Sequence, residues 1–144
     1  MVDRAASTSW SGSVGAGSGT VSLESSGAGR FPISLDSRAG APEGRTGPEE
    51  LIAAAHSSCY AMQLSALLTN AGLPPESLDV RAVVTQEQQG AAFPITGIAL
   101  TVAGAVPGCD DDTFRACADE AKRTCPVSVA LAGTDITVHA HLTS

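Results

Sequence analysis

Hydrophobic and polar residues alternate near the start of the chain and again at its end. Within residues 20–25 (TVSLES) and 30–36 (RFPISLD), apolar side chains stand at alternate positions. A period of two is typical of a β-strand with one buried face. The pattern predicts hairpin-like strands joined by Gly-rich turns over residues 8–36, and a last strand over residues 135–142 (DITVHAHL).

A long apolar segment, PEELIAAAHSSCYAMQLSALLTN, follows a Gly- and Pro-rich loop that we expect over residues 37–47. Pro48 is a residue favoured at the first position of a helix. Glu49 and Glu50 suit the positive, N-terminal end of the helix dipole. The sequence therefore predicts a helix over residues 48–70, and its few charges indicate that this helix is buried on most sides.

The second half of the chain predicts two strands, a helix and a short further helix. The strands are expected over residues 78–88 and 95–106, and the helix over residues 110–124, which begins with aspartates and ends with basic residues. A short helix follows in CPVSVALAG. The order β-rich, α, ββ, α, β indicates an α+β fold with helices packed on an antiparallel-rich sheet. The length suits one domain, residues 1–144.

The net charge of -7 excludes two classes of partner. No basic patch is available to neutralise the phosphates of a nucleic acid or an anionic membrane surface. The N-terminal residues lack the apolar core of a secretory signal, so we expect a cytoplasmic protein. Thiols are kept reduced there, and the four cysteines are then free, catalytic or metal-bound rather than permanently bridged.

Cys59 lies among alanines in the predicted long helix. Its thiol is either small core filling or a reactive group, and reactivity requires a nearby cation that favours the thiolate. The helix has no Lys or Arg, so the nearest candidates in sequence are Arg38 and Arg45 in the preceding loop. A carboxylate at the start of the helix could hold such an arginine in a bidentate pair.

The remaining cysteines differ in setting. If Pro126 begins the short helix, Cys125 is its N-cap, and the N–H groups there would lower the pKa of its thiol. Cys109 stands beside aspartates that would raise its pKa, and Cys117 fits the core face of a helix. The spacing of these three cysteines matches no zinc pattern. His56, three residues before Cys59, is either a base or a packed helix histidine.

Two motifs resemble the family of osmotically inducible protein C (OsmC) and organic hydroperoxide resistance protein (Ohr). They are PEELIAAAHSSCYAMQLSALL at residues 48–68 and CPVS at residues 125–128, and the form of the first is closer to the OsmC branch. The resemblance covers nearly the whole chain. It implies an α+β OsmC-like fold, with antiparallel-rich sheets packed on a long central helix. It also implies an intertwined homodimer with active sites at the subunit interface.

Membership would make the protein a thiol peroxidase that reduces organic hydroperoxides in the response to oxidative and osmotic stress. By position, Cys59 would be the peroxidatic cysteine, Cys125 the resolving cysteine, and Glu49 the residue that orients the arginine of the family. Arg38 fits that arginine best, and Arg45 is the alternative. The resemblance implies no metal or organic cofactor. It implies an external dithiol as reductant, with lipoyl groups or small dithiols as candidates.

A non-catalytic protein of the same fold is the alternative, either a dimeric redox sensor or a binder of apolar ligands. The joint presence of Arg38, Glu49, Cys59 and Cys125 favours the enzyme, because a binder would tolerate the loss of any of them. The low aromatic content of 3% indicates an aliphatic rather than an aromatic pocket.

Overall fold

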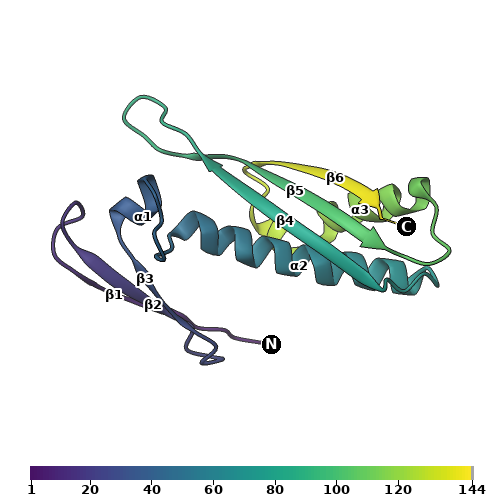
Figure 1. Cartoon of the computed structure of the whole chain (residues 1–144), viewed down its shortest axis with the longest axis horizontal. Coiled ribbons are helices and arrows are strands. Elements are labelled where there is room, and N and C mark those ends of the chain that lie inside the picture. The colour runs from purple at the N-terminus through teal and green to yellow at the C-terminus, as the bar shows by residue number, and fades with distance from the viewer. Residues whose placement is uncertain (144) are drawn as a thin grey trace. The chain divides into compact units, whose positions relative to one another are not determined.

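Two compact units make up the chain, one on either side of the bond between Leu51 and Ile52 (Figure 1). The computed structural model describes residues 1–143. The first unit holds a small sheet, a short helix and the start of the long helix. The second unit holds the rest of that helix, a second sheet and two further helices.

The first unit contains a three-stranded antiparallel sheet with the order β1-β2-β3. Its strands are β1 (Ser7–Ser11), β2 (Ser18–Ser22) and β3 (Arg30–Ile33). Val21 is the buried residue of the central strand. The hairpin-like strands predicted for residues 8–36 are therefore confirmed.

A short helix, α1 (Leu35–Ala39), replaces the strand end and loop that the sequence predicted at this point. The cause is a reciprocal pair of hydrogen bonds at its start. The Ser34 hydroxyl accepts from the backbone N–H of Ser37 at 3.1 Å, and the Ser37 hydroxyl accepts from the backbone N–H of Ser34 at 3.0 Å. This capping box satisfies N–H groups that a helix start leaves unpaired. It fixes Arg38 in the last turn of α1.

The long helix α2 (Pro48–Asn70) has the bounds that the sequence predicted. Its burial differs from the prediction, because only His56, Tyr60, Leu64 and Leu68 are buried. These residues are four apart and form one stripe along the helix. Among residues 1–143, α2 is also the one helix long and apolar enough to cross a membrane, judged by length and composition alone. Core helices of soluble proteins pass the same test.

The sheet of the second unit has the order β4-β5-β6 (Figure 1). β4 (Ser77–Gln86) pairs antiparallel with β5 (Ile95–Ala105), and β5 pairs parallel with β6 (Asp135–Leu142). The register aligns apolar residues across the sheet, as in the row formed by Val80, Val102 and Ala140. The predicted strands and the antiparallel-rich α+β architecture are confirmed.

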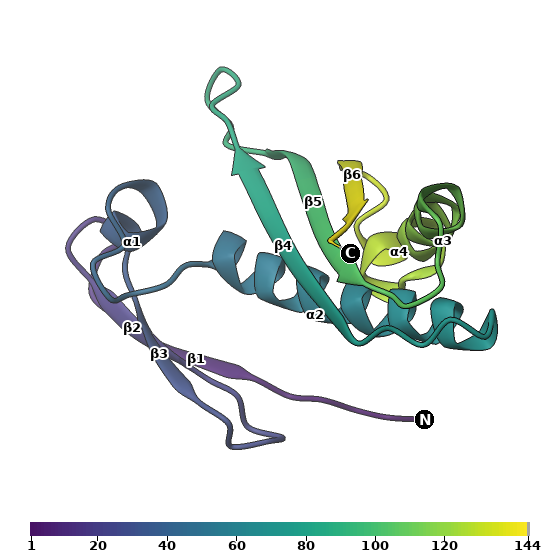
Figure 2. The same cartoon turned by 45° about the vertical axis from the view of Figure 1, so that its right-hand side comes forward.

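Two helices connect β5 to β6, namely α3 (Asp111–Thr124) and α4 (Pro126–Ala130) (Figure 2). Asp110 caps α3 by accepting from the backbone N–H of Thr113 at 2.8 Å. The helices of this unit pack on one face of the sheet around a shared core. That core contains Tyr60, Leu64 and Leu68 of α2, Leu100 and Val102 of β5, and Phe114 and Ala121 of α3.

Candidate active site

Two thiols that are 66 residues apart in sequence lie in contact in the second unit. Cys59 comes from the middle of α2, and Cys125 comes from the junction between α3 and α4. Their Sγ atoms are 2.9 Å apart, and both cysteines are reduced. A disulfide has an S–S length of about 2.05 Å. The pair can therefore form a disulfide after a shift of about 1 Å.

The two thiols differ in exposure to solvent. Cys125 is fully buried, with 0% of its surface exposed, whereas Cys59 is partly exposed. Of the two residues, Cys59 is therefore the more accessible to a small molecule from solvent.

Cys125 is the N-cap of α4, and Pro126 is the first residue of that helix, as the sequence predicted. Burial alone would raise the pKa of Cys125. The thiol of Cys59, the N–H and hydroxyl groups of Ser128 and the N–H group of Val127 outweigh burial and lower it. The sulfur forms no capping hydrogen bond with a backbone N–H group of the helix, so the N–H groups act at longer range.

Cys59 shows the opposite shift. Burial raises the pKa of its thiol, and so does the neighbouring Cys125, while the N–H group of Val127 opposes them weakly. Within the pair, these shifts favour the thiolate on Cys125 over the thiolate on Cys59. A positive charge beside Cys59 would lower the pKa of its thiol and favour the thiolate.

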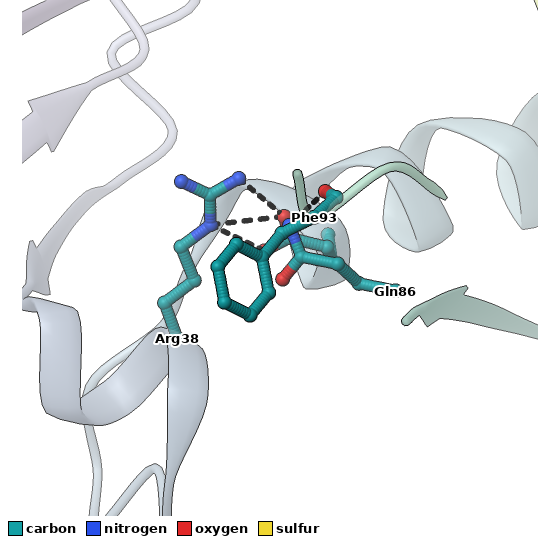
Figure 3. Close-up of polar contacts among 4 residues, drawn as sticks. Arg38, Gln86 and Phe93 are labelled. Carbon is teal, nitrogen blue, oxygen red and sulfur yellow. Dashed lines mark hydrogen bonds and ion pairs between the residues drawn. The ribbon is translucent and has the colours of Figure 1, made fainter. Parts of the chain in front are cut away.

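Arg38 and Glu49 form a bidentate ion pair in the first unit (Figure 3). The Nε atom of Arg38 donates to both carboxylate oxygens, at 3.0 and 3.2 Å, and its Nη2 atom donates to Oε1 at 2.7 Å. The Arg38 side chain is 42% exposed and that of Glu49 is 15% exposed. Arg45 is exposed and forms no ion pair with the residues described. Of the two candidate arginines, Arg38 is the one that the carboxylate holds.

A hollow of about 200 Å³ lies beside Arg38 in the first unit. Its walls are mostly apolar and are formed by Trp10, Val14, Ile33, Ser34, Leu35, Arg38 and Pro48. The walls are mainly aliphatic, as expected from the low aromatic content, although Trp10 contributes one large ring. A guanidinium at the edge of an apolar hollow suits a ligand with a polar head and an apolar tail.

The β4–β5 hairpin is held at its base by the Gln86 side chain, whose amide donates to the Phe93 carbonyl oxygen at 2.9 Å (Figure 3). Phe93 is 58% exposed at this end of the second unit. The contact belongs to the hairpin and takes no part in the thiol site.

The other candidates from the sequence lie outside the thiol pair. Burial and Asp110 raise the pKa of Cys109, as the sequence predicted, and Cys117 is partly buried in α3. His139 and His141 are exposed on one face of β6, with ring centroids 6.0 Å apart.

Ser128 is the site residue that the sequence did not single out. It is the fourth residue of the CPVS motif and stands three positions after Cys125 at the start of α4. Backbone N–H groups at that position face an N-cap side chain, and this is the signal that could have found it. Ser128 also contacts His56, which is buried and therefore has a lowered pKa.

A partly exposed thiol that touches a buried one on an α+β scaffold is the arrangement of a dithiol redox protein. A sequence model of the family described as OsmC-like protein matches residues 40–139, and the chain belongs to that family. It is 44% identical over 122 residues to the peroxiredoxin OsmC of Escherichia coli (strain K12), which is 85% of each chain. This similarity supports the predicted class, a cysteine-based peroxidase.

Solved structures share the fold at lower identity. An organic hydroperoxide resistance protein OsmC from Legionella pneumophila matches with a TM-score of 0.76 and 20% identity, over 100% of this chain and 98% of that one. The organic hydroperoxide resistance protein OhrB of Bacillus subtilis matches with a TM-score of 0.74 and 21% identity, over 95% and 98% of the two chains. The predicted OsmC-like fold is confirmed.

Proposed function

We propose that this protein reduces organic hydroperoxides to alcohols, with Cys59 as the peroxidatic thiol and Cys125 as the resolving thiol. The observation that carries the proposal is the 2.9 Å contact between the two sulfurs, of which Cys59 is partly exposed and Cys125 is buried. The more exposed thiol, that of Cys59, is assigned the attack on the peroxide. The buried thiol in contact with it, that of Cys125, is assigned the attack on the resulting sulfenic acid.

The reaction balances without a metal or an organic cofactor. The Cys59 thiolate attacks one oxygen of the peroxide, the O–O bond breaks, and the alkoxide takes a proton to leave as the alcohol. Cys59 is then a sulfenic acid. The Cys125 thiolate attacks the Cys59 sulfur, hydroxide leaves and takes a proton to become water, and a disulfide remains. An external dithiol reduces this disulfide through a mixed disulfide and is itself oxidised.

The guanidinium of Arg38 supplies a positive charge for Cys59 in this proposal. A nearby cation lowers the pKa of a thiol and stabilises negative charge on the departing oxygen. Its bidentate contact with Glu49 limits the positions that the guanidinium can take, so its charge is oriented before substrate arrives. The apolar hollow beside Arg38 would hold the organic part of the hydroperoxide.

The proposal includes a homodimer, because the second unit by itself leaves much apolar surface of α2 uncovered. Outside the buried stripe, Ala54, Ala55, Met62 and Ala66 are exposed, and Met62 is 68% exposed. Such a surface is typical of an interface with another chain. In a C₂ dimer, both subunits would contribute this same surface to the interface.

The dimer also gives a source for the arginine. Glu49 and Cys59 are ten residues apart on α2, which corresponds to about 15 Å at 1.5 Å per residue. A guanidinium bound to Glu49 stays near the start of its own helix. We therefore propose that the Arg38–Glu49 pair serves the Cys59 thiol of the second copy.

The proposal also covers the domain organisation, the reductant and the cellular compartment. The solved structures match at least 95% of this chain and so cover both compact units, which supports one domain over residues 1–144. Lipoyl groups or small dithiols are suitable reductants. We place the enzyme in the cytoplasm, where thiols are kept reduced and where it would protect against oxidative and osmotic stress.

The test is turnover of cumene hydroperoxide with a dithiol reductant. Cys59→Ser should abolish turnover, because a serine hydroxyl is too weakly acidic to replace a thiolate. Cys109→Ser and Cys117→Ser are matched controls and should retain the wild-type rate. Substantial turnover by Cys59→Ser would refute the assignment. A wild-type protein that is oxidised once and never turns over would instead support the sensor.

A further inference from the structure

His56 is a buried titratable residue that the proposed reaction does not use. It lies on α2, three residues before Cys59, and has 0% of its surface exposed. Its Nε2 atom is 2.7 Å from the Ser128 hydroxyl, and both residues are buried. Burial lowers the pKa of His56, so the ring is neutral at neutral pH. His56 is therefore not the cation that Cys59 requires.

The second ring nitrogen decides how the imidazole is protonated. Nδ1 is buried and has no hydrogen-bond partner among the described residues. An unpaired buried N–H group is rarer in proteins than an unpaired acceptor. The proton therefore resides on Nε2, and Nδ1 keeps a bare lone pair. In this tautomer the Nε2–H group donates to the Ser128 oxygen.

Once the Ser128 oxygen accepts from His56, its own proton is free to be donated. Ser128 is the third residue of α4, and Cys125 is the N-cap of the same helix. An N-cap side chain faces the backbone N–H group of the third residue, so the Ser128 N–H group lies toward the Cys125 sulfur, and the Ser128 side chain belongs to the same turn. The N–H group and the hydroxyl of Ser128 both contribute to the lowered pKa of Cys125.

We propose that His56 and Ser128 are positioning residues for the resolving step, in which His56 Nε2–H donates to Ser128 Oγ and the Ser128 hydroxyl donates to the sulfur of Cys125. This inference rests on the proposed function. The chain of donors holds the hydroxyl proton toward the sulfur and favours the thiolate form of Cys125, which attacks the Cys59 sulfenic acid. The first step, at Cys59, does not require it.

The direct test titrates Cys125 without peroxide. In a variant with Cys59, Cys109 and Cys117 all replaced by serine, thiolate absorbance reports Cys125 alone. Tyr60 also lies close to Cys125, but burial raises the pKa of its phenol, so it stays neutral through neutral pH. Removing the hydroxyl by a Ser128→Ala change should raise the pKa of Cys125 by about one unit, which lowers its thiolate fraction by up to about tenfold.

Three further variants separate positioning from packing. His56→Ala should raise the pKa of Cys125 by less, because Ser128 remains but is no longer oriented. His56→Gln places an amide N–H near the former Nε2 position and should restore much of the effect, and Ser128→Thr keeps a hydroxyl and should do likewise. Ser58→Ala is the matched control, since the Ser58 hydroxyl donates to the Ala55 carbonyl of its own helix.

Rapid mixing with one equivalent of cumene hydroperoxide then resolves the two steps. With all cysteines present, Ser128→Ala should leave alcohol release unchanged and slow disulfide formation about tenfold. Equal slowing of both steps, or an unchanged pKa of Cys125, would overturn the inference. If a variant does not fold, ¹⁵N NMR of the wild-type imidazole still decides, because a proton on Nδ1 contradicts the chain of donors. The titration and the NMR measurement need no turnover, so they remain valid if the peroxidase assignment fails.

Discussion

Replacing Cys125 by serine should convert this enzyme into a reagent that works once. The Cys125 sulfur is 2.9 Å from that of Cys59, so it meets the sulfenic acid without diffusion. Well-oriented groups within one molecule reach effective concentrations of about 10⁵ M or more. The concentration of an external thiol, about 1 mM, is about 10⁸-fold lower than this effective concentration. Even if the real advantage is a small part of this, resolution in Cys125→Ser should be slower by several orders of magnitude.

The assay combines alcohol release with intact-mass spectrometry. Cys125→Ser should release one equivalent of alcohol and then stall, with Cys59 one oxygen atom heavier and, in excess peroxide, two oxygen atoms heavier. Cys117→Ser is the control and should turn over many times. Sustained turnover by Cys125→Ser would refute the resolving role. The same role would be refuted by oxidised wild-type protein that links Cys109 to Cys117 and leaves Cys59 and Cys125 unlinked.

Two predictions concern the cation and the second subunit. Arg38→Ala should raise the pKa of Cys59, so that peroxide turnover falls steeply at neutral pH and partly recovers at higher pH. Arg45→Ala should change both quantities little. The pKa of Cys59 is measured from the pH dependence of its alkylation in a variant without the other cysteines. If Arg45→Ala alone moves the alkylation curve, Arg45 is the activating residue. Co-refolding equal amounts of Arg38→Ala and Cys59→Ser chains should restore about a quarter of wild-type turnover, since half of the dimers are mixed and each mixed dimer has one intact site. No restored turnover would show that each chain uses its own arginine.

Local features of this fold were predictable because their causes are local in sequence. The bounds of α2 follow from Pro48 and the adjacent glutamates at its start and from Gly72 and Pro74 just after its end, and the structure has the same bounds. The helix α1 was missed because its capping box pairs Ser34 with Ser37. A capping box is recognised in sequence by a glutamate or glutamine at N3, three residues after the N-cap, and a serine at N3 gives a weaker signal.

The thiol site depended on contacts between distant segments, and spacing does not reveal them. The contact between Cys59 and Cys125 exists because the connection from β5 to β6 brings the start of α4 against α2. The resemblance to a family supplied that pair, while the bond between His56 and Ser128 required the structure. The burial of α2 was overestimated for a related reason. Apolar composition along a helix does not show which of its faces the rest of the chain covers.

The position of Cys125 at the start of α4 also matters when the disulfide is opened again. In the proposed cycle the incoming dithiol attacks the more exposed sulfur, that of Cys59, and Cys125 is the leaving group. A thiol of lower pKa leaves faster, and a stabilised thiolate makes its disulfide a stronger oxidant. The N–H and hydroxyl groups that lower the pKa of Cys125 thus favour its departure as well as its attack. In the proposed cycle, a disulfide between Cys59 and Cys125 would therefore accept electrons readily, and a dithiol of modest reducing strength would regenerate the enzyme.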